Sequence, residues 1–352
     1  MRTSKEYREC LNMQKGKTIG IVYIFRGENA LGYKHYECWE GDVISSWIHA
    51  VEELGGLPLI MDVRTFCEKA MNGTLPYLDY VINLNNGTYD ISVLGLVTSV
   101  CAFLKLPCIP GNTLTTVTGE NKQISNMLAE IIGIKIPNNM SKSEAGGIVR
   151  PIGLGSSIGI QRIESFEETT EKPDNSYLYQ EFIEGYDFTT PLLYNPISSS
   201  LSCLPAIIYI PDNSSPEWFL GENQKRNHSG YKKASIRIQK HLSDLYICMA
   251  HVINVSTYCR IDARFRCNSI NEVQVAEKKG IPYEKVYFME INPMPTIKNN
   301  INFCTSIENL TDESPFYFAY SEYMDYHYGC GTSMGFILSC AIQSIEDTIP
   351  KC

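Results

Sequence analysis

The sequence predicts an α/β protein in which a parallel sheet near the N-terminus is followed by a strand-rich remainder. Between residues 18 and 110, strand-length apolar runs alternate with segments of helical hydrophobic spacing, which is the pattern of βαβ units. From about residue 146 onward, short apolar runs dominate, so this part is of α+β type. The chain has 352 residues, 44% of them hydrophobic, and is long enough for two or three sub-domains.

Each N-terminal element follows from its residues. Val43, Trp47 and Val51 recur at helical spacing, so a helix is predicted over residues 42–53, and Gly55 and Gly56 end it. A second, more apolar helix is predicted over residues 92–103. Four apolar runs are predicted strands: residues 18–25, 57–61, 78–84 and 107–110.

The later elements are read in the same way. Predicted helices cover residues 119–132, 243–252, 316–326 and 333–345. Predicted strands cover residues 147–151, 176–183, 188–194, 204–210, 258–266 and 285–292. The polar segment 211–233 is predicted to be a long loop, and a loop of that length inside a compact domain usually has a function.

Composition argues against several classes of protein. The net charge is −9, and basic residues form only short runs such as 225–226 and 232–233, which disfavours a nucleic-acid partner. The apolar stretch 91–109 contains Lys105 and ends at a proline, so we expect a buried helix and no membrane partner. The 13 cysteines include no Cys-x-x-Cys pair, which favours free thiols in a reducing compartment over a zinc site. We therefore expect a cytoplasmic protein.

A cation followed by a glycine-rich loop marks the first candidate site. Arg150 ends a predicted strand, and residues 153–159 then contain three glycines, Ser156 and Ser157. Glycines such as Gly159 let backbone N–H groups approach a phosphate, and hydroxyl groups add donors. A tight structural turn explains the loop equally well when it is considered alone.

The second candidate site is the extended segment 179–187. An extended segment of this kind can offer its backbone to the edge of an adenine, and Asp187, just past a glycine, can accept hydrogen bonds from ribose hydroxyls. An ordinary strand and turn is the alternative interpretation.

Two predicted strands carry oxygen ligands on one face. Residues i and i+2 of a strand share a face, so Arg260 points the same way as Asp262, and Glu290 the same way as Asn292, while Ile261, Met289 and Ile291 occupy the other faces. If the two strands are neighbours, two carboxylates and an amide oxygen come together, and hard oxygen ligands of this kind suit Mg²⁺. A solvated strand face with a chance ion pair is the alternative for either strand alone.

Taken in order, these features resemble the ATP-grasp superfamily, and within it the D-alanine–D-alanine ligase-like branch. The resemblance runs from about residue 85 to residue 296 and includes Lys122, near the start of a predicted helix. It implies an ATP-grasp fold with an N-terminal parallel α/β domain over residues 1–112. Two α+β sub-domains, residues 113–187 and 188–352, would clasp ATP. A homodimer is common in this branch.

The resemblance also implies a role for each matching residue. Lys122 and Arg150 would contact the nucleotide phosphates, and Ser156, Ser157 and Gly159 would form the loop above them. The adenine hinge would be Gln180, Glu181, Phe182 and Ile183, with Asp187 on the ribose. Asp262, Glu290 and Asn292 match ligands for two Mg²⁺ ions, with Mn²⁺ as the alternative ion. Arg260 matches the arginine that stabilises the acyl phosphate and the oxyanion, and Lys225 matches, more weakly, a lysine that reaches the γ-phosphate.

The chain departs from the family pattern at several positions. Arg150 stands where lysine is frequent, Asn121 replaces an aspartate, and Thr296 replaces a glycine. The glycine-rich and acidic patch that binds the first D-alanine is not recognisable in residues 27–40.

The resemblance therefore implies a ligase that joins a small carboxylate to an amine through an acyl phosphate, with amino acids as its substrates and a role in specialised metabolism. Two alternatives stay open. One is the same chemistry with an unusual acceptor, such as an enamine or imine nitrogen or a carrier thiol. The other is a nucleotide-binding regulator without turnover.

Overall fold

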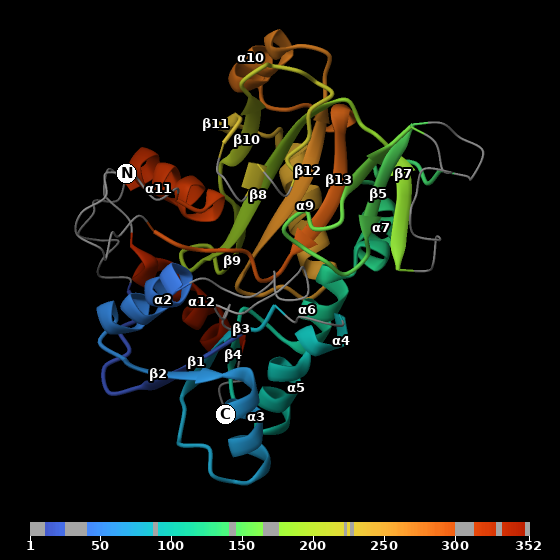
Figure 1. Ribbon diagram of the computed structural model, residues 1–352. Coiled ribbons are helices and arrows are strands. Elements are labelled where there is room, and N and C mark those ends of the chain that lie inside the picture. Colours follow the sequence, from blue (N-terminus) through green and yellow to red (C-terminus); the bar gives the residue numbers. More distant parts are fainter. Residues whose placement is uncertain are drawn as a thin grey trace.

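Three sheets follow one another along the chain in the computed structural model (Figure 1). The structure describes residues 11–24, 41–86, 91–140, 146–164, 176–221, 224–225, 229–299, 313–328 and 333–348. The mixed α/β class predicted from the sequence is confirmed, with one parallel sheet followed by two antiparallel ones.

The N-terminal sheet is parallel, with strand order β2-β1-β3-β4. Its strands are β1 (Thr18–Tyr23), β2 (Leu57–Asp62), β3 (Tyr80–Leu84) and β4 (Cys108–Ile109). Its helices are α2 (Gly41–Glu53), α3 (Val63–Met71), α4 (Ile91–Leu94) and α5 (Leu96–Phe103). The helix predicted over residues 92–103 is thus divided near Gly95. The unpredicted α3 is capped by Asp62, whose carboxylate accepts the Thr65 N–H at 3.0 Å.

A small antiparallel sheet comes next, with β5 (Gly147–Pro151) between β6 (Gln161–Ile163) and β7 (Tyr177–Glu181). It follows helices α6 (Thr113–Glu120) and α7 (Lys122–Ile131). The prediction of a single helix over residues 119–132 is wrong, because the helical conformation is interrupted at Asn121 between α6 and α7. The Asn121 side chain accepts the Ile124 N–H at 3.0 Å and so caps α7, which places Lys122 in the first turn.

The large antiparallel sheet has the order β11-β10-β8-β12-β13, with β9 paired to β8. Its strands are β8 (Gly185–Asn195), β9 (Ser200–Cys203), β10 (Ala206–Pro211), β11 (Tyr231–Ile236), β12 (Tyr258–Arg266) and β13 (Val286–Asn292). Helices α9 (Lys240–Val252) and α10 (Ile270–Lys279) and the 3₁₀ turn η3 (Tyr283–Lys285) accompany it. The predicted loop 211–233 therefore ends in a strand, because β11 pairs with β10 along its whole length.

Side-chain alternation gives the large sheet two different faces. Cys259, Ile261 and Phe265 of β12 enter a core with α7 and α9. Tyr258, at the start of β12, faces the opposite way and packs in a core with α2 and the C-terminal helices α11 (Pro315–Tyr328) and α12 (Met334–Thr348). Beyond Tyr258 the same face carries Arg260, Asp262 and Arg264 and is open to a cavity. The boundaries proposed at residues 112 and 187 stay a prediction.

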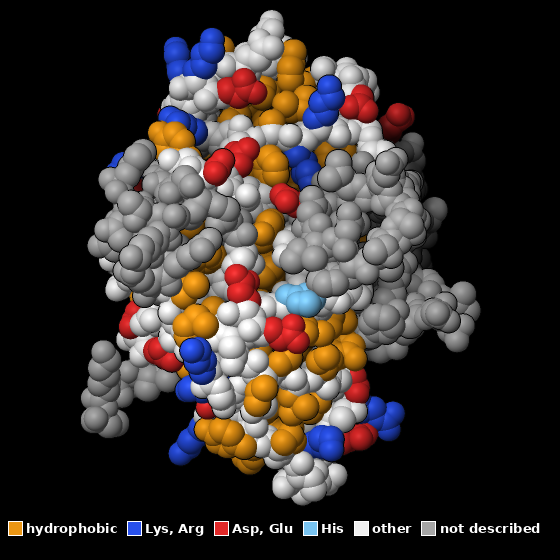
Figure 2. Space-filling view, turned by 90° about the vertical axis from the view of Figure 1, so that its left-hand side faces the viewer, with side chains coloured by type: hydrophobic (Ala, Val, Ile, Leu, Met, Phe, Trp, Pro, Cys, Tyr) orange, Lys and Arg blue, Asp and Glu red, His pale blue; other side chains and the backbone are white. Residues whose placement is uncertain are grey.

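Lys and Arg side chains are spread among acidic and hydrophobic ones over the described part of the face shown in Figure 2. Of the helices that the structure describes, none combines the length and the apolar character needed to cross a membrane. Seven of the cysteines in the described residues are free thiols: Cys67, Cys101, Cys108, Cys203, Cys248, Cys259 and Cys267.

Candidate active site

The floor of the site is formed by β12 and β13, which are antiparallel neighbours. Arg260 lies opposite Asn292, and Asp262 lies opposite Glu290. The arrangement required by the sequence analysis, with both carboxylates on one sheet face, is therefore present. Their role as metal ligands stays a prediction.

A β-bulge corrects one part of the strand prediction. The register shifts between Asp262 and Ala263, so that Ala263 pairs with Phe288 and Met289 is the extra residue. Met289 therefore lines the cavity instead of facing the core, whereas Phe288 is fully buried in the core. The bulge re-aims Glu290 and Asn292 toward the cavity, a use of bulges that recurs next to active sites.

A cavity of about 530 Å³ lies above this floor. It brings together most of the residues singled out in the sequence, although they come from two of the three predicted sub-domains. Among its lining residues are Arg150, Ser156, Ser157, Glu181, Phe182, Ile183, Asp187, Lys225, Arg260, Asp262, Glu290 and Asn292. Lys122, Gly159 and Gln180 lie next to the lining residues but do not themselves line it.

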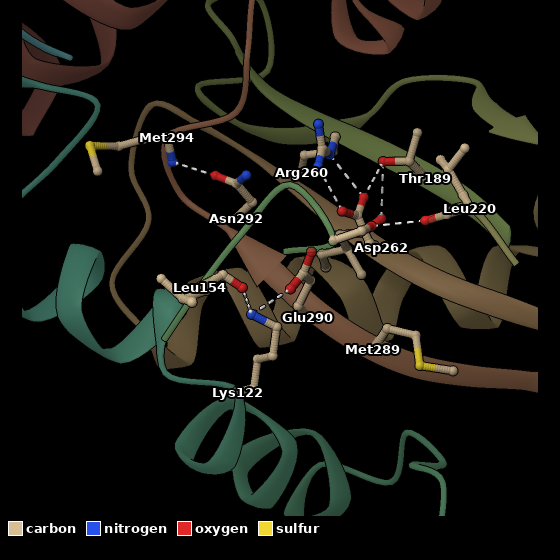
Figure 3. Close-up of polar contacts among 12 residues, drawn as sticks. Lys122, Leu154, Thr189, Leu220, Arg260, Asp262, Met289, Glu290, Asn292 and Met294 are labelled. Atoms are coloured by element: carbon tan, nitrogen blue, oxygen red, sulfur yellow. Dashed lines mark hydrogen bonds and ion pairs between the residues drawn. The ribbon is translucent and has the colours of Figure 1, made fainter. Parts of the chain in front are cut away.

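Glu290 is the electrostatic centre of the floor. Its Oε2 lies 3.0 Å from Nζ of Lys122, which also donates to the Leu154 carbonyl at 2.7 Å; Figure 3 shows the two side chains pointing toward each other. Burial raises the pKa of Glu290, but Lys122, Lys225 and Arg150 outweigh this effect and lower the pKa to about 2. Glu290 is therefore ionised across the neutral range.

Burial also lowers the pKa of two further cations near Glu290, Lys225 and Arg150. Desolvation lowers the pKa of Lys225, and the negative charges of Glu290 and Asp262 counter part of that effect. Desolvation likewise lowers the pKa of Arg150 against the charge of Glu290. A buried cation of this kind is stabilised by added negative charge, such as that of a phosphate.

Arg260 and Asp262 form a planar two-point ion pair, with Nε to Oδ1 at 2.8 Å and Nη2 to Oδ2 at 2.7 Å. The Thr189 hydroxyl donates to the same Oδ1 at 2.5 Å (Figure 3). Burial lowers the pKa of Arg260, but Asp262 outweighs it and raises that pKa above its usual value. Tyr209 stands beside this pair, and burial raises the pKa of its hydroxyl.

The glycine-rich loop adopts a backbone that favours ligand contact. Ser156 and Ser157 have positive φ angles of 54° and 60°, which are costly for residues with a side chain. Gly159 has φ 68°, and a Cβ on it would lie 2.9 Å from Cγ of Pro151. Such outliers cluster at functional sites, and this loop lines the cavity.

The hinge is supported from behind by side chains. Gln180 is fully buried; its Oε1 accepts from Nη2 of Arg150 at 2.6 Å and its Nε2 donates to the Pro137 carbonyl at 3.2 Å. Nη1 of Arg150 reaches the Met289 carbonyl at 3.1 Å. Arg150 therefore joins the small sheet to the floor strand, and the Gln180 side chain serves the scaffold while Glu181, Phe182 and Ile183 line the cavity.

Comparison with known proteins agrees with this geometry. No protein-family model matches the chain. The D-alanine–D-alanine ligase of Aquifex aeolicus is 22% identical over 218 residues, 57% of this chain and 67% of that protein. The one from a Sulfurovum species is 27% identical over 185 residues, 48% of this chain and 52% of that protein, so this match spans about half of the relative.

Solved structures match over almost the whole chain. A Bacillus anthracis D-alanine–D-alanine ligase complexed with ATP gives a TM-score of 0.59 at 14% identity, covering 94% of this chain and 98% of that one. The Vibrio cholerae D-alanyl-alanine synthetase A gives 0.62 at 12% identity, covering 95% and 99%. The chain has the ATP-grasp fold of the D-alanine–D-alanine ligase type. The Enterococcus faecalis VanG D-Ala:D-Ser ligase also matches, with a TM-score of 0.58 at 15% identity over 94% of this chain and 99% of that one.

The donor set of this ATP-grasp chain fits a magnesium site. The carboxylates of Asp262 and Glu290 and the amide oxygen of Asn292 share one sheet face and line the cavity. Each of these three side chains already interacts with a neighbouring group of the protein. Asp262 pairs with Arg260, Glu290 pairs with Lys122, and Asn292 Oδ1 accepts a hydrogen bond from the Met294 N–H at 2.9 Å. Within the described residues, no group of three or more His, Cys, Asp or Glu side chains is placed to hold a metal. Mg²⁺ here would thus rest on two carboxylates, one amide and the substrate phosphates.

Sequence reasoning missed several residues at this site. Arg264 and Thr189 face the cavity side of the floor, and strand alternation from Asp262 and Asp187 would have found both. Lys298 and Ser314 line the cavity from a segment distant in sequence, for which no local pattern gave a signal. The region 27–40, where the first D-alanine patch was sought, lies outside the described residues.

Proposed function

We propose that the chain is an ATP-dependent ligase that joins a carboxylate to an amine through an acyl phosphate, releasing ADP and phosphate. The observation that carries this proposal is a cavity in which the hinge residues Glu181, Phe182 and Ile183 meet a floor of Arg260, Asp262, Glu290 and Asn292. A cavity of about 530 Å³ lies in the range of small-molecule sites.

The residues divide the work along the cavity. The hinge at Glu181, Phe182 and Ile183 would bind the adenine edge, with the triphosphate running toward the glycine-rich loop. Phosphoryl transfer depends on positioning and charge neutralisation more than on covalent help from the protein. Burial lowers the pKa of both Lys225 and Arg150, and a phosphate that enters the cavity would supply them with a counter-charge. Mg²⁺ on Asp262, Glu290 and Asn292 would neutralise the remaining phosphate charge.

The acyl half of the reaction falls to Arg260. Phosphorylation turns the carboxylate into a mixed anhydride, and an amine then attacks its carbonyl carbon and expels phosphate. The fixed guanidinium of Arg260, held in place by Asp262, would stabilise the oxyanion, and removal of such a donor costs about 10²–10³ in rate in other enzymes. The long loop over residues 211–233 would keep water from the anhydride.

The substrate class follows from the relatives, which are named for D-alanine and D-serine. Amino acids are therefore the first candidates, with a cytoplasmic role in specialised metabolism and a homodimer as secondary parts of the proposal.

The test is ADP release by the purified protein with ATP and Mg²⁺, screened over pairs of amino acids and related amines. Asp262→Asn, which keeps the shape and loses the charge, should abolish any stimulated release. Asp244→Asn, an exposed ion-pair partner on α9, is the matched control and should leave release unchanged.

ATP binding without stimulation by any pair would instead favour an unusual acceptor or a regulator. Absence of ATP binding would refute the proposal.

A further inference from the structure

Residues 211–221, here called the strap, form the first part of the long loop and lie along the hinge. The Gly185 N–H donates to the Pro216 carbonyl at 2.7 Å, and the Tyr186 hydroxyl donates to the Ser214 carbonyl at 2.7 Å. The strap is therefore bound to the residues that directly follow the hinge and does not stand free over the cavity.

Arg264 of β12 is the junction between hinge and strap. Its guanidinium donates to the Ile183 carbonyl at 2.7 Å, the Gly185 carbonyl at 2.7 Å and the Trp218 carbonyl at 2.9 Å. Nη1 donates to Oδ2 of Asp187 at 2.8 Å, directly across the strand pair. Arg264 is only 3% exposed, so its charge is buried and fully used for these contacts. Because its guanidinium donates to three backbone carbonyls and one carboxylate, Arg264 fixes the relative positions of the hinge and the strap.

Leu220 extends the junction to the glycine-rich loop. Its N–H donates to Oδ2 of Asp187 at 2.8 Å, and its carbonyl accepts from the Ser157 hydroxyl at 2.8 Å. A continuous chain of bonds thus runs from the loop at Ser157 through the strap to Asp187 and Arg264. Within the described part of the chain, both hydrogen bonds to the Asp187 carboxylate end on Oδ2, and we assign Oδ1 to a ribose hydroxyl.

An aromatic contact reinforces the same link. The guanidinium of Arg264 lies 4.9 Å from the ring centroid of Phe182, and that ring meets Phe219 of the strap edge-on at 6.3 Å. The hinge residue Phe182 is therefore held by the strap on one side and by Arg264 on another, and its backbone position depends on both.

We propose that Arg264 is a positioning residue for the nucleoside part of the nucleotide. It fixes the hinge at Ile183 and ties the strap to it, so that adenine and ribose meet a preformed edge. This inference rests on the proposed nucleotide site and adds to it a residue that touches no phosphate. Loss of Arg264 should weaken recognition of the nucleoside and spare that of the phosphates.

The experiment compares ATP with inorganic tripolyphosphate, which lacks the nucleoside. Arg264→Met removes the donors and keeps the length, and Arg264→Lys keeps the charge without the planar fork. Arg266→Met is the matched control: Arg266 sits on the same strand, is 43% exposed in its side chain, and contacts Glu181 at 3.4 Å. Dissociation constants are measured by calorimetry for ATP and by competition for tripolyphosphate, with circular dichroism to verify folding.

We expect Arg264→Met to raise the Kd for ATP by about 10- to 100-fold, because several charge-assisted hydrogen bonds are lost. Arg264→Lys should recover part of that loss, and the tripolyphosphate Kd and the Arg266→Met values should stay within about threefold of wild type.

An unchanged ATP Kd in Arg264→Met overturns the inference, as does an equal loss for both ligands. If Arg264→Met does not fold, an ATP Kd in folded Arg264→Lys equal to wild type has the same meaning. Failure of the wild-type protein to bind ATP would overturn the proposed function instead.

Discussion

The Glu290→Gln substitution measures how much the negative charge of Glu290 contributes to the free energy of unfolding. The pKa of Glu290 falls from 4.5 to about 2 on folding, against the raising effect of its own burial. This lowering of the pKa corresponds to about 3 kcal/mol of folding free energy at neutral pH. Glutamine keeps the shape but leaves Lys122, which is 2% exposed, without its counter-charge at 3.0 Å. We therefore expect the variant to lose about 3 kcal/mol of stability, the lower end of the range for breaking a buried ion pair.

The same reasoning fixes the pH dependence. Because the folded pKa lies below the unfolded value of 4.5, the folded state favours the carboxylate. The stabilisation from Glu290 is complete above pH 4.5 and is lost as the pH falls toward 2. The difference in stability between wild type and variant should therefore be largest above pH 4.5 and shrink below it.

Urea denaturation followed by circular dichroism across this pH range is the assay. Glu68→Gln removes an exposed ion pair with Arg64 on α3 and is the control, for which little change is expected. Equal stability of wild type and Glu290→Gln above pH 4.5 would refute the reasoning, and so would a stability difference that persists undiminished at low pH.

Two further predictions concern the ligand. Gly159→Ala places a Cβ at φ 68° and against Pro151, so ATP binding should weaken by about 1–2 kcal/mol in calorimetry. Gly133→Ala is the control, because Gly133 also has a positive φ, 91°, but no atom lies near its Cβ position. Equal Kd values for the two variants would contradict a role of the glycine-rich loop in ATP binding. Removal of divalent ions with a chelator should weaken ATP binding strongly, and addition of Mg²⁺ should restore it. ATP binding that does not respond to the chelator would exclude the metal site at Asp262 and Glu290.

The parts of the site that follow strand alternation were predictable from the sequence. Within each strand, the two site residues stand at positions i and i+2, so they lie on the same face of the sheet. This applies to Arg260 and Asp262 in β12 and to Glu290 and Asn292 in β13. The order of motifs along the chain added the fold, which the comparisons bear out. Local pattern and motif order together therefore gave the floor and the architecture.

The parts that depend on contacts between distant segments were not predictable. The bulge at Met289 arises from a mismatch between two strands, which no single strand reveals. The strap looked like a polar loop because it bonds to Gly185 and Arg264 through its own backbone carbonyls, and backbone groups leave no trace in the sequence. Arg264 itself was visible as the second arginine of an Arg-x-Asp-x-Arg pattern, but its partners are carbonyls 46 to 81 residues away.

The charges that line the cavity explain why a metal ion belongs in the proposed reaction. Among the described lining residues, six are cationic (Arg150, Lys225, Lys233, Arg260, Arg264 and Lys298) and six are acidic (Glu120, Glu181, Asp187, Asp262, Glu290 and Glu313). Lys122 beside them adds one positive charge, in a chain whose net charge is −9. A triphosphate that enters such a cavity meets little excess positive charge, so protein cations alone are too few to neutralise it. The carboxylates that create this shortage are oxygen ligands of the kind that Mg²⁺ prefers, so in the proposed reaction the floor would gain its phosphate affinity together with the ion.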